Sequence, residues 1–230
     1  MTMALIGPVA LKGVLPTLVE EYRRASGVAV ETEILLNPEV PVRILGGAHF
    51  DLAITNPWYV PDLVASGHAE GSSHAAFGRV PLALAAAGAT DDPASSPGAI
   101  AALLLDAETI AFTGTGTSGR IFHEMTDRLG VRAQIAGRLK PMGTGEPICA
   151  VADGRCGLAV APLTVVRATS GVRAVAICPP EMGTDIEMSI FLARPSSDSP
   201  AARDFLSFLC DPAWDPWLER AGVERFTLPG

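Results

Sequence analysis

The stretch "TIAFTGTGTSGRIFHEMTDRLG", residues 109–130, joins a strand-like run to a helix-like run through a loop of glycines and hydroxyl residues. The run "TIAFT" is short and apolar, as in a buried strand. After the loop, apolar residues recur at helical spacing and would form the buried face of a helix: Ile121, Phe122, Met125 and Leu129. The stretch therefore predicts a strand, a tight loop and a helix, the unit from which parallel α/β sheets are built.

The glycine spacing of this loop, Gly114 to Gly119, also fits a dinucleotide-binding loop. Such a site needs an acidic residue about 20 residues further on to bind the ribose. Residues 134–143, "QIAGRLKPMG", contain no acid. The stretch does not match a phosphate-binding loop of the Walker type either. Arg120 occupies the position that requires lysine, and Ile121 occupies the position of the Ser or Thr that binds magnesium. The sequence predicts no nucleotide site and no cofactor.

Two interpretations of the loop remain open. The unpaired N–H groups and the dipole at the start of a helix suit a small anion, and Arg120 could add a bidentate grip on a carboxylate or phosphate. Alternatively, Ser118 or Thr117 simply caps the helix and the glycines allow tight packing.

Composition narrows the class of protein. Of the 230 residues, 48% are hydrophobic and 18% charged, as expected for an ordered globular chain. The net charge of -8 argues against a nucleic-acid partner. The four cysteines form no C-x-x-C pair, and none of the four histidines forms an i, i+4 pair, so no metal site is expected.

Localisation depends on how the chain begins. No Lys or Arg precedes the first apolar run, and no apolar stretch approaches the ~20 residues that span a bilayer. The sequence therefore predicts no membrane segment and a cytoplasmic protein. A periplasmic protein from which a signal peptide has been removed would look the same.

Strand-like and helix-like segments alternate through most of the chain, which predicts an α/β fold with parallel-rich sheets. Several strands end in short loops that feed helices, and in a parallel sheet such loops share the carboxyl edge, where ligands bind. A ligand cleft is therefore expected. Its predicted lining residues are Pro8, Val9, Lys12, Thr55, Asn56, Thr115, Thr117, Ser118, Gly119, Arg120, Gly145 and Thr164.

The order of segments, including "FDLAITN", "GRVPLALAAAG", "IAFTGTGTSGRIFHEM" and "AVADGRCGLAVAPLTVV", resembles that of type 2 periplasmic solute-binding proteins. The resemblance is to the molybdate-binding-protein-like branch, which also includes trans-aconitate isomerase-like proteins. It implies two α/β lobes joined by crossover strands "RVPLALA" and "MSIFLAR", with a small anion held in a cleft between the lobes. Residues 1–81 and 189–230 would form lobe 1, and residues 82–188 lobe 2.

The resemblance also implies which ligand contacts are kept. That branch has a serine in the first loop, where this chain reads Gly7-Pro8-Val9-Ala10. Thr55 keeps the hydroxyl of the second loop, whereas Val160 replaces the tyrosine expected near the late strand. The loop "TGTSG" followed by "GTGEP" looks more like relatives that handle small carboxylates than like molybdate binders.

Two functions stay open. The chain could bind a small di- or tricarboxylate or an oxyanion, with a transporter as partner only if the protein is exported. Alternatively, it could be a cofactor-independent intracellular isomerase of an unsaturated polycarboxylate, which needs a base and cations to stabilise the developing anion. The candidate catalytic residues are Glu146, His123 and Lys140, and the candidate carboxylate clamps are Arg120, Arg43 and Lys12. Each of these side chains also has an ordinary structural interpretation.

Overall fold

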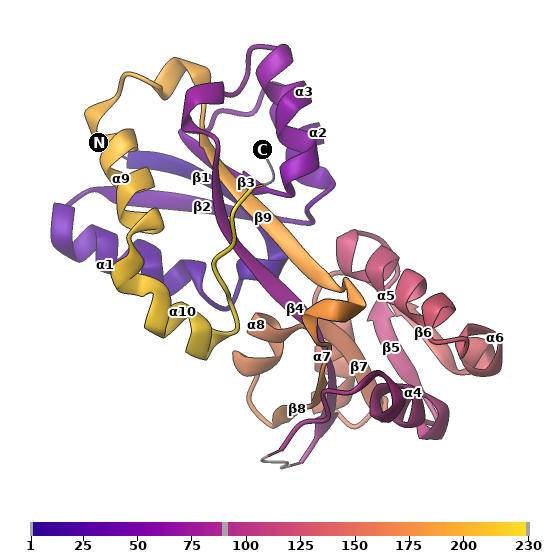
Figure 1. Ribbon diagram of the computed structural model, residues 1–230. Helices are drawn as coiled ribbons and strands as arrows, with labels where there is room; N and C mark the ends of the chain where they lie inside the picture. The colour runs from indigo at the N-terminus through magenta and orange to yellow at the C-terminus, as the bar shows by residue number, and fades with distance from the viewer. Residues whose placement is uncertain (1, 89–91, 229–230) are drawn as a thin grey trace. The chain divides into compact units, whose positions relative to one another are not determined.

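A computed structural model describes residues 2–88 and 92–228 of the chain, which divides into two compact units (Figure 1). The first unit comprises Met1–Arg79 and Glu187–Gly230, and the second comprises Val80–Ile186. The chain leaves the first unit within strand β4 (Ala75–Ala87) and returns to it within strand β9 (Asp185–Leu192). Strand β4 contains the segment "RVPLALA", and β9 contains "MSIFL" of "MSIFLAR", since it ends at Leu192.

The sheet of the first unit has the strand order β2-β1-β3-β9. Strand β1 pairs in parallel with both β2 and β3, and β3 pairs antiparallel with β9. Strand β3 is buried along its whole length, as is usual where helices cover both faces of a sheet. The bounds are β1 (Thr2–Pro8), β2 (Ala29–Leu35) and β3 (Leu52–Thr55).

Helices lie on both sides of this sheet, with α2 and α3 on one side and α1 and α9 on the other (Figure 1). Val40 from α2 and Leu63 from α3 belong to one buried cluster with Ile6 of β1 and Phe191 of β9. On the opposite side, Tyr22 of α1 packs against helix α9. The bounds are α1 (Leu15–Ser26), α2 (Glu39–Leu45), α3 (Val60–Ala65), α9 (Pro200–Cys210) and α10 (Asp215–Ala221).

The sheet of the second unit has the order β4-β7-β5-β6, and β8 also pairs with β4. Strand β5 pairs in parallel with β6 and β7, whereas β4 pairs antiparallel with β7 and β8. The strands are β5 (Ile110–Thr113), β6 (Leu139–Met142), β7 (Leu158–Pro162) and β8 (Val172–Ile177). The helices are α4 (Pro97–Asp106), α5 (Thr117–Arg128), α6 (Arg132–Ile135), α7 (Glu146–Ala152) and α8 (Leu163–Arg167).

The strand, loop and helix predicted from residues 109–130 are confirmed as β5, a short glycine loop and α5. Ile121 and Met125 are buried as expected, and Phe122 packs against Phe112 of the strand with ring centroids 5.2 Å apart. Leu129 is only half-buried, because it lies at the C-cap where the helix ends.

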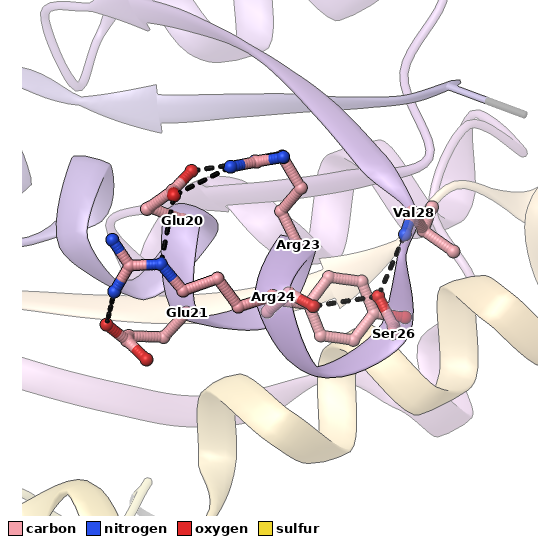
Figure 2. Close-up of polar contacts among 7 residues, drawn as sticks. Glu20, Glu21, Arg23, Arg24, Ser26 and Val28 are labelled. Carbon is pink, nitrogen blue, oxygen red and sulfur yellow. Dashed lines mark hydrogen bonds and ion pairs between the residues drawn. The ribbon is translucent and has the colours of Figure 1, made fainter.

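Helix α1 carries a chain of ion pairs on its exposed face (Figure 2). Arg23 donates to Glu20 at 2.7 and 2.8 Å, and Arg24 donates to Glu20 at 3.1 Å and to Glu21 at 2.6 Å. The hydrogen bond from Arg23 is the main reason that the pKa of Glu20 falls from 4.5 to about 2. The cluster places both arginines in the last turn, where the helix dipole favours positive charge.

We expect this cluster to make stability depend on pH under acid conditions. Because the folded pKa of Glu20 lies below its ordinary value, its contribution is complete above about pH 4.5 and is lost as the pH falls towards 2. Thermal unfolding of the wild type and of Glu20→Gln should therefore differ near neutral pH and converge near pH 2. Glu181→Gln, at an exposed site of the second unit, is the control. A difference between wild type and Glu20→Gln that is the same at every pH would contradict the assignment.

Candidate functional site

Helix α5, which follows the loop after β5, begins without a side-chain cap. The N-cap residue is Gly116, at φ 91° and ψ 176°, and as a glycine it supplies no side-chain cap. The expectation that Ser118 or Thr117 is the N-cap is wrong in this detail, since the helix already starts at Thr117. A residue with a Cβ rarely adopts the conformation of Gly116, so the loop uses glycine at the position where a capping hydroxyl would stand.

Gly119 holds this helix end close to the strand. A Cβ at residue 119 would lie 2.1 Å from the carbonyl oxygen of Thr113 and 3.4 Å from its carbonyl carbon. Only a residue without a side chain therefore fits between the first turn of α5 and the end of β5. The helix start, with its backbone N–H groups, is fixed at the carboxyl edge of the sheet.

The predicted residues of the second unit gather at that edge. Strands β5, β6 and β7 run parallel, so the loops that follow them leave the sheet on the same side. Gly114 N donates to Met142 O at 2.9 Å and ties the first two loops together. Residues Thr115 to Arg120 follow β5, Gly145 follows β6, and Thr164 lies buried in α8 after β7. Val160, which replaces the expected tyrosine, is buried in β7.

Two charged candidates of this unit, Arg120 and Glu146, already have protein partners. The Arg120 guanidinium pairs with Glu124 at 2.7 Å on the exposed face of α5. The Glu146 carboxylate accepts a hydrogen bond from Gly143 N at 2.8 Å and so closes the turn before α7. Lys140 is exposed on strand β6. Glu146 and Lys140 therefore flank one turn, and Arg120 lies on the neighbouring loop.

His123 lies on the side of α5 that faces strand β5. Its ring meets Phe112 edge-on at 5.0 Å, and its Nδ1 atom is buried without a hydrogen-bond partner. Burial lowers the pKa of His123; the charge of Arg132 adds to this effect and that of Asp127 opposes it. The imidazole is therefore favoured in its neutral form, and no carboxylate orients it as in a histidine general base.

In the first unit, β1 and β3 are parallel neighbours, so the loops after Pro8 and after Thr55 share one edge. Val9 starts a 3-10 turn, η1 (Val9–Leu11), and Lys12 follows it as an exposed residue. Arg43 pairs with Glu33 of β2 at 2.9 Å, so its guanidinium already has a carboxylate partner within the first unit.

Buried polar residues collect around the end of β3. Thr55 donates its hydroxyl hydrogen to Asn37 O at 3.0 Å, and Asn56 donates from Nδ2 to Glu187 O at 2.6 Å. His74 Nε2 lies 2.8 Å from the hydroxyl of Ser189, which is opposite Thr55 in the β3–β9 register. Sequence reasoning found Thr55 and Asn56 but missed Asn37, His74 and Ser189. No local pattern could have indicated them, because they meet through pairs far apart in the chain.

Within residues 2–88 and 92–228, no group of three or more His, Cys, Asp or Glu side chains could hold a metal ion. None of the helices in this described part of the chain is long and apolar enough to cross a bilayer.

Comparison with known proteins assigns the family. The family described as "Bacterial extracellular solute-binding protein" matches residues 4–224. The chain belongs to this family. The predicted type 2 solute-binding fold is thereby confirmed, and the description as extracellular agrees with the exported alternative. The cytoplasmic location stays a prediction. A search of curated protein sequences gave no match.

Solved structures agree with this fold. The periplasmic molybdate-binding protein of Azotobacter vinelandii superimposes with a TM-score of 0.80 at 17% identity, covering 99% of this chain and 100% of that one. The substrate-binding domain of a putative molybdenum ABC transporter from Clostridium difficile gives 0.76 at 16% identity, covering 98% and 99%. The sulfate-binding protein SubI of Mycobacterium tuberculosis H37Rv gives 0.70 at 15% identity, covering 97% and 86%. At these identities the likeness concerns the fold alone.

We expect Gly119→Ala to destabilise the protein, because the new methyl group would overlap the Thr113 carbonyl and force α5 away from β5. Overpacking of this kind costs about 1–3 kcal/mol in the free energy of unfolding. Gly98→Ala is the matched control: that glycine lies in the first turn of α4, and a Cβ there would meet nothing within 4 Å. Equal unfolding free energies for the two variants, measured in denaturant, would show that the close approach is not a constraint.

Proposed function

We propose that the protein binds a small anion, either a di- or tricarboxylate or an oxyanion, as a solute-binding protein. The observation that carries the proposal is the start of α5, a helix of 12 residues whose N-cap is a glycine with no side-chain cap. The dipole and the first-turn N–H groups of such a helix favour a negative charge. Membership of a solute-binding family supports the same conclusion.

Among small anions, we propose that carboxylates fit better than tetrahedral metal oxyanions. The serine and tyrosine that the molybdate-binding branch uses are replaced here by the Gly7–Ala10 segment and by buried Val160. Arg120, beside the helix start, has the planar fork that binds a carboxylate through two hydrogen bonds. In the structure Arg120 pairs with Glu124 at 2.7 Å, so a bound carboxylate would replace that partner or share the guanidinium with it.

We also propose that the two units serve as the lobes of the binding protein and that each offers an anion the loops at its own carboxyl edge. The loops that end β1 and β3 would contribute from the first unit, with Lys12 as the cation. A transporter would be the partner of an exported form. The family match and the separate carboxyl-edge loops of each unit support this arrangement.

The isomerase alternative requires a base that is free to abstract a proton. Glu146 is exposed but is hydrogen-bonded to Gly143 N, and neutral His123 is packed between aromatic rings. Proton NMR in deuterated water tests the alternative directly with trans-aconitate. Solvent exchange or double-bond migration that disappears in Glu146→Gln would establish catalysis, whereas unchanged substrate over hours would leave a binding protein.

We expect Ser118→Ala and Arg120→Ala each to weaken anion binding by about 1–3 kcal/mol, because each removes a hydrogen-bond donor to a charged group. A thermal-shift screen with molybdate, sulfate, citrate and trans-aconitate selects the anion, since binding to the folded state raises its stability. Calorimetric titration then compares the variants. Arg155→Ala is the control, because Arg155 is an exposed arginine of the same unit paired with Asp153. Undiminished affinity in both variants would contradict the proposed site.

A further inference from the structure

Trp58 is an exposed aromatic residue just beyond the end of strand β3 in the first unit. It is 47% exposed. The other large hydrophobic residues that are exposed within residues 2–88 and 92–228 are aliphatic: Val42, Leu45 and Leu105. The chain's two other tryptophans, Trp214 and Trp217, are less exposed and pack against each other with ring centroids 5.9 Å apart. Trp58 therefore differs from both in being open to solvent.

The pairing of β1 with β3 places Trp58 near the loop that carries Lys12. Ile6 of β1 pairs with Ala53 of β3, and each lies two residues before the end of its strand. The two strands therefore end at the same level, about 4.8 Å apart. A 3-10 turn follows each strand: η1 leads to the exposed Lys12, and η2 (Pro57–Tyr59) contains Trp58.

The position of Trp58 along the chain keeps it close to this edge. Trp58 is three residues beyond Thr55, so its Cα lies within about 10 Å of the end of β3. The exposed ammonium group of Lys12 and the exposed indole of Trp58 thus belong to the two loops at the carboxyl edge of the first unit. In a parallel sheet this edge is where ligands bind.

The backbone around Trp58 is held in place by its neighbours. Tyr59 N donates to Asn56 O at 3.1 Å, and Asn56 Nδ2 donates to Glu187 O at 2.6 Å. Val60, the next residue, is fully buried and begins α3. The Tyr59 ring packs against the indole with centroids 5.8 Å apart and planes tilted by 53°. The turn is therefore fixed while the indole stays accessible, so a ligand pays little ordering entropy to use it.

An indole discriminates between anions that carry the same charge. The face of an aromatic ring is electron-rich, so a compact tetrahedral oxyanion gains nothing by lying over it. A planar conjugated carbon skeleton stacks on the face in an offset arrangement and buries apolar surface as well. Lys12, as a point charge, attracts any anion and cannot make this distinction.

We propose that Trp58 contacts the ligand and determines its class, a planar conjugated carboxylic acid, in preference to saturated acids and tetrahedral oxyanions. The indole takes the carbon skeleton, and Lys12 takes a carboxylate. Asn56 and Tyr59 are positioning residues, because they hold the turn and the indole. This inference rests on the proposed function, since it names the ligand class for the same carboxyl-edge loops.

Calorimetric titration with two matched pairs of acids tests the proposal. The pair trans-aconitate and tricarballylate carries three carboxylates per molecule, and the pair fumarate and succinate carries two. Within each pair the acids differ only in one carbon–carbon double bond. The wild type should bind the unsaturated member of at least one pair about two- to tenfold more tightly, because only that member stacks.

Variants assign this preference to the indole. Trp58→Leu should abolish it, and Trp58→Phe should retain part of it, because phenylalanine keeps an aromatic face. Trp217→Leu is the matched control, since Trp217 lies in α10 of the same unit and should leave the preference unchanged.

Fluorescence keeps the proposal testable if Trp58→Leu does not fold. The chain has three tryptophans, so Trp58 is the sole one left in the double variant Trp214→Phe, Trp217→Phe. Its emission should change saturably with the preferred unsaturated acid, at the dissociation constant that calorimetry gives for the same variant.

The outcomes separate this inference from the proposed function. Equal preference in the wild type and Trp58→Leu would overturn the inference, as would a wild type that shows no preference. Tighter binding of molybdate or sulfate than of either unsaturated acid, or unchanged Trp58 emission at saturation, would overturn it as well. Each of these results leaves a small-anion binding protein. No saturable binding of any of these anions would overturn the proposed function and the inference together.

Discussion

The close approach between Gly119 and the Thr113 carbonyl is the constraint on which the candidate site depends. The start of α5 lies so close to the end of β5 that a Cβ atom at residue 119 would overlap the Thr113 carbonyl oxygen. Because β6 and β7 run parallel to β5, the loops that follow all three strands leave the same edge. The start of α5 is therefore positioned by its packing against β5, and the hydrogen bond from Gly114 N to Met142 O joins the loop after β6 to it.

The buried polar side chains at the end of β3 already have hydrogen-bond partners in the protein. In the first unit, Thr55 and Asn56 are buried and donate to backbone carbonyls of Asn37 and Glu187, so these donors stabilise the loop itself. Burying such groups without partners would be costly, which explains why each has one. In the second unit, the N-cap of α5 has no side-chain partner. Under the proposed function, the anion contacts of the second unit are therefore mainly backbone donors at the start of α5.

Helix α5 and the α/β class could be predicted from the sequence because both follow from local periodicity. The 3.6-residue spacing of Ile121, Phe122 and Met125 identifies α5, and alternating segments identify the α/β class. Of the two interpretations left open for the loop, the one with Ser118 or Thr117 as N-cap is wrong, because the helix already begins at Thr117 and Gly116 is the N-cap. That the glycines of the loop allow tight packing was part of one of those interpretations, but the sequence did not identify Thr113 as the residue that Gly119 contacts.

Contacts between distant parts of the chain left no local signal. The pairs Asn56–Glu187, His74–Ser189 and Phe77–Arg225 join residues more than 100 positions apart. Their residue types are common in loops and helices, so a single sequence gives no reason to connect them. Glu146 shows the opposite case: its carboxylate closes a turn only three residues away, an ordinary structural role that the sequence already allowed.

The most direct test of the central claim is an amide NMR titration of the ¹⁵N-labelled protein with trans-aconitate, citrate, molybdate and sulfate. The account predicts that at least one of these anions causes saturable shifts at the amides of Thr117, Ser118 and Gly119, larger than those elsewhere in α5. Saturable binding that leaves these three amides unmoved would contradict the claim that the start of α5 holds the anion. Absence of saturable binding by all four would contradict the proposal of a small-anion site itself.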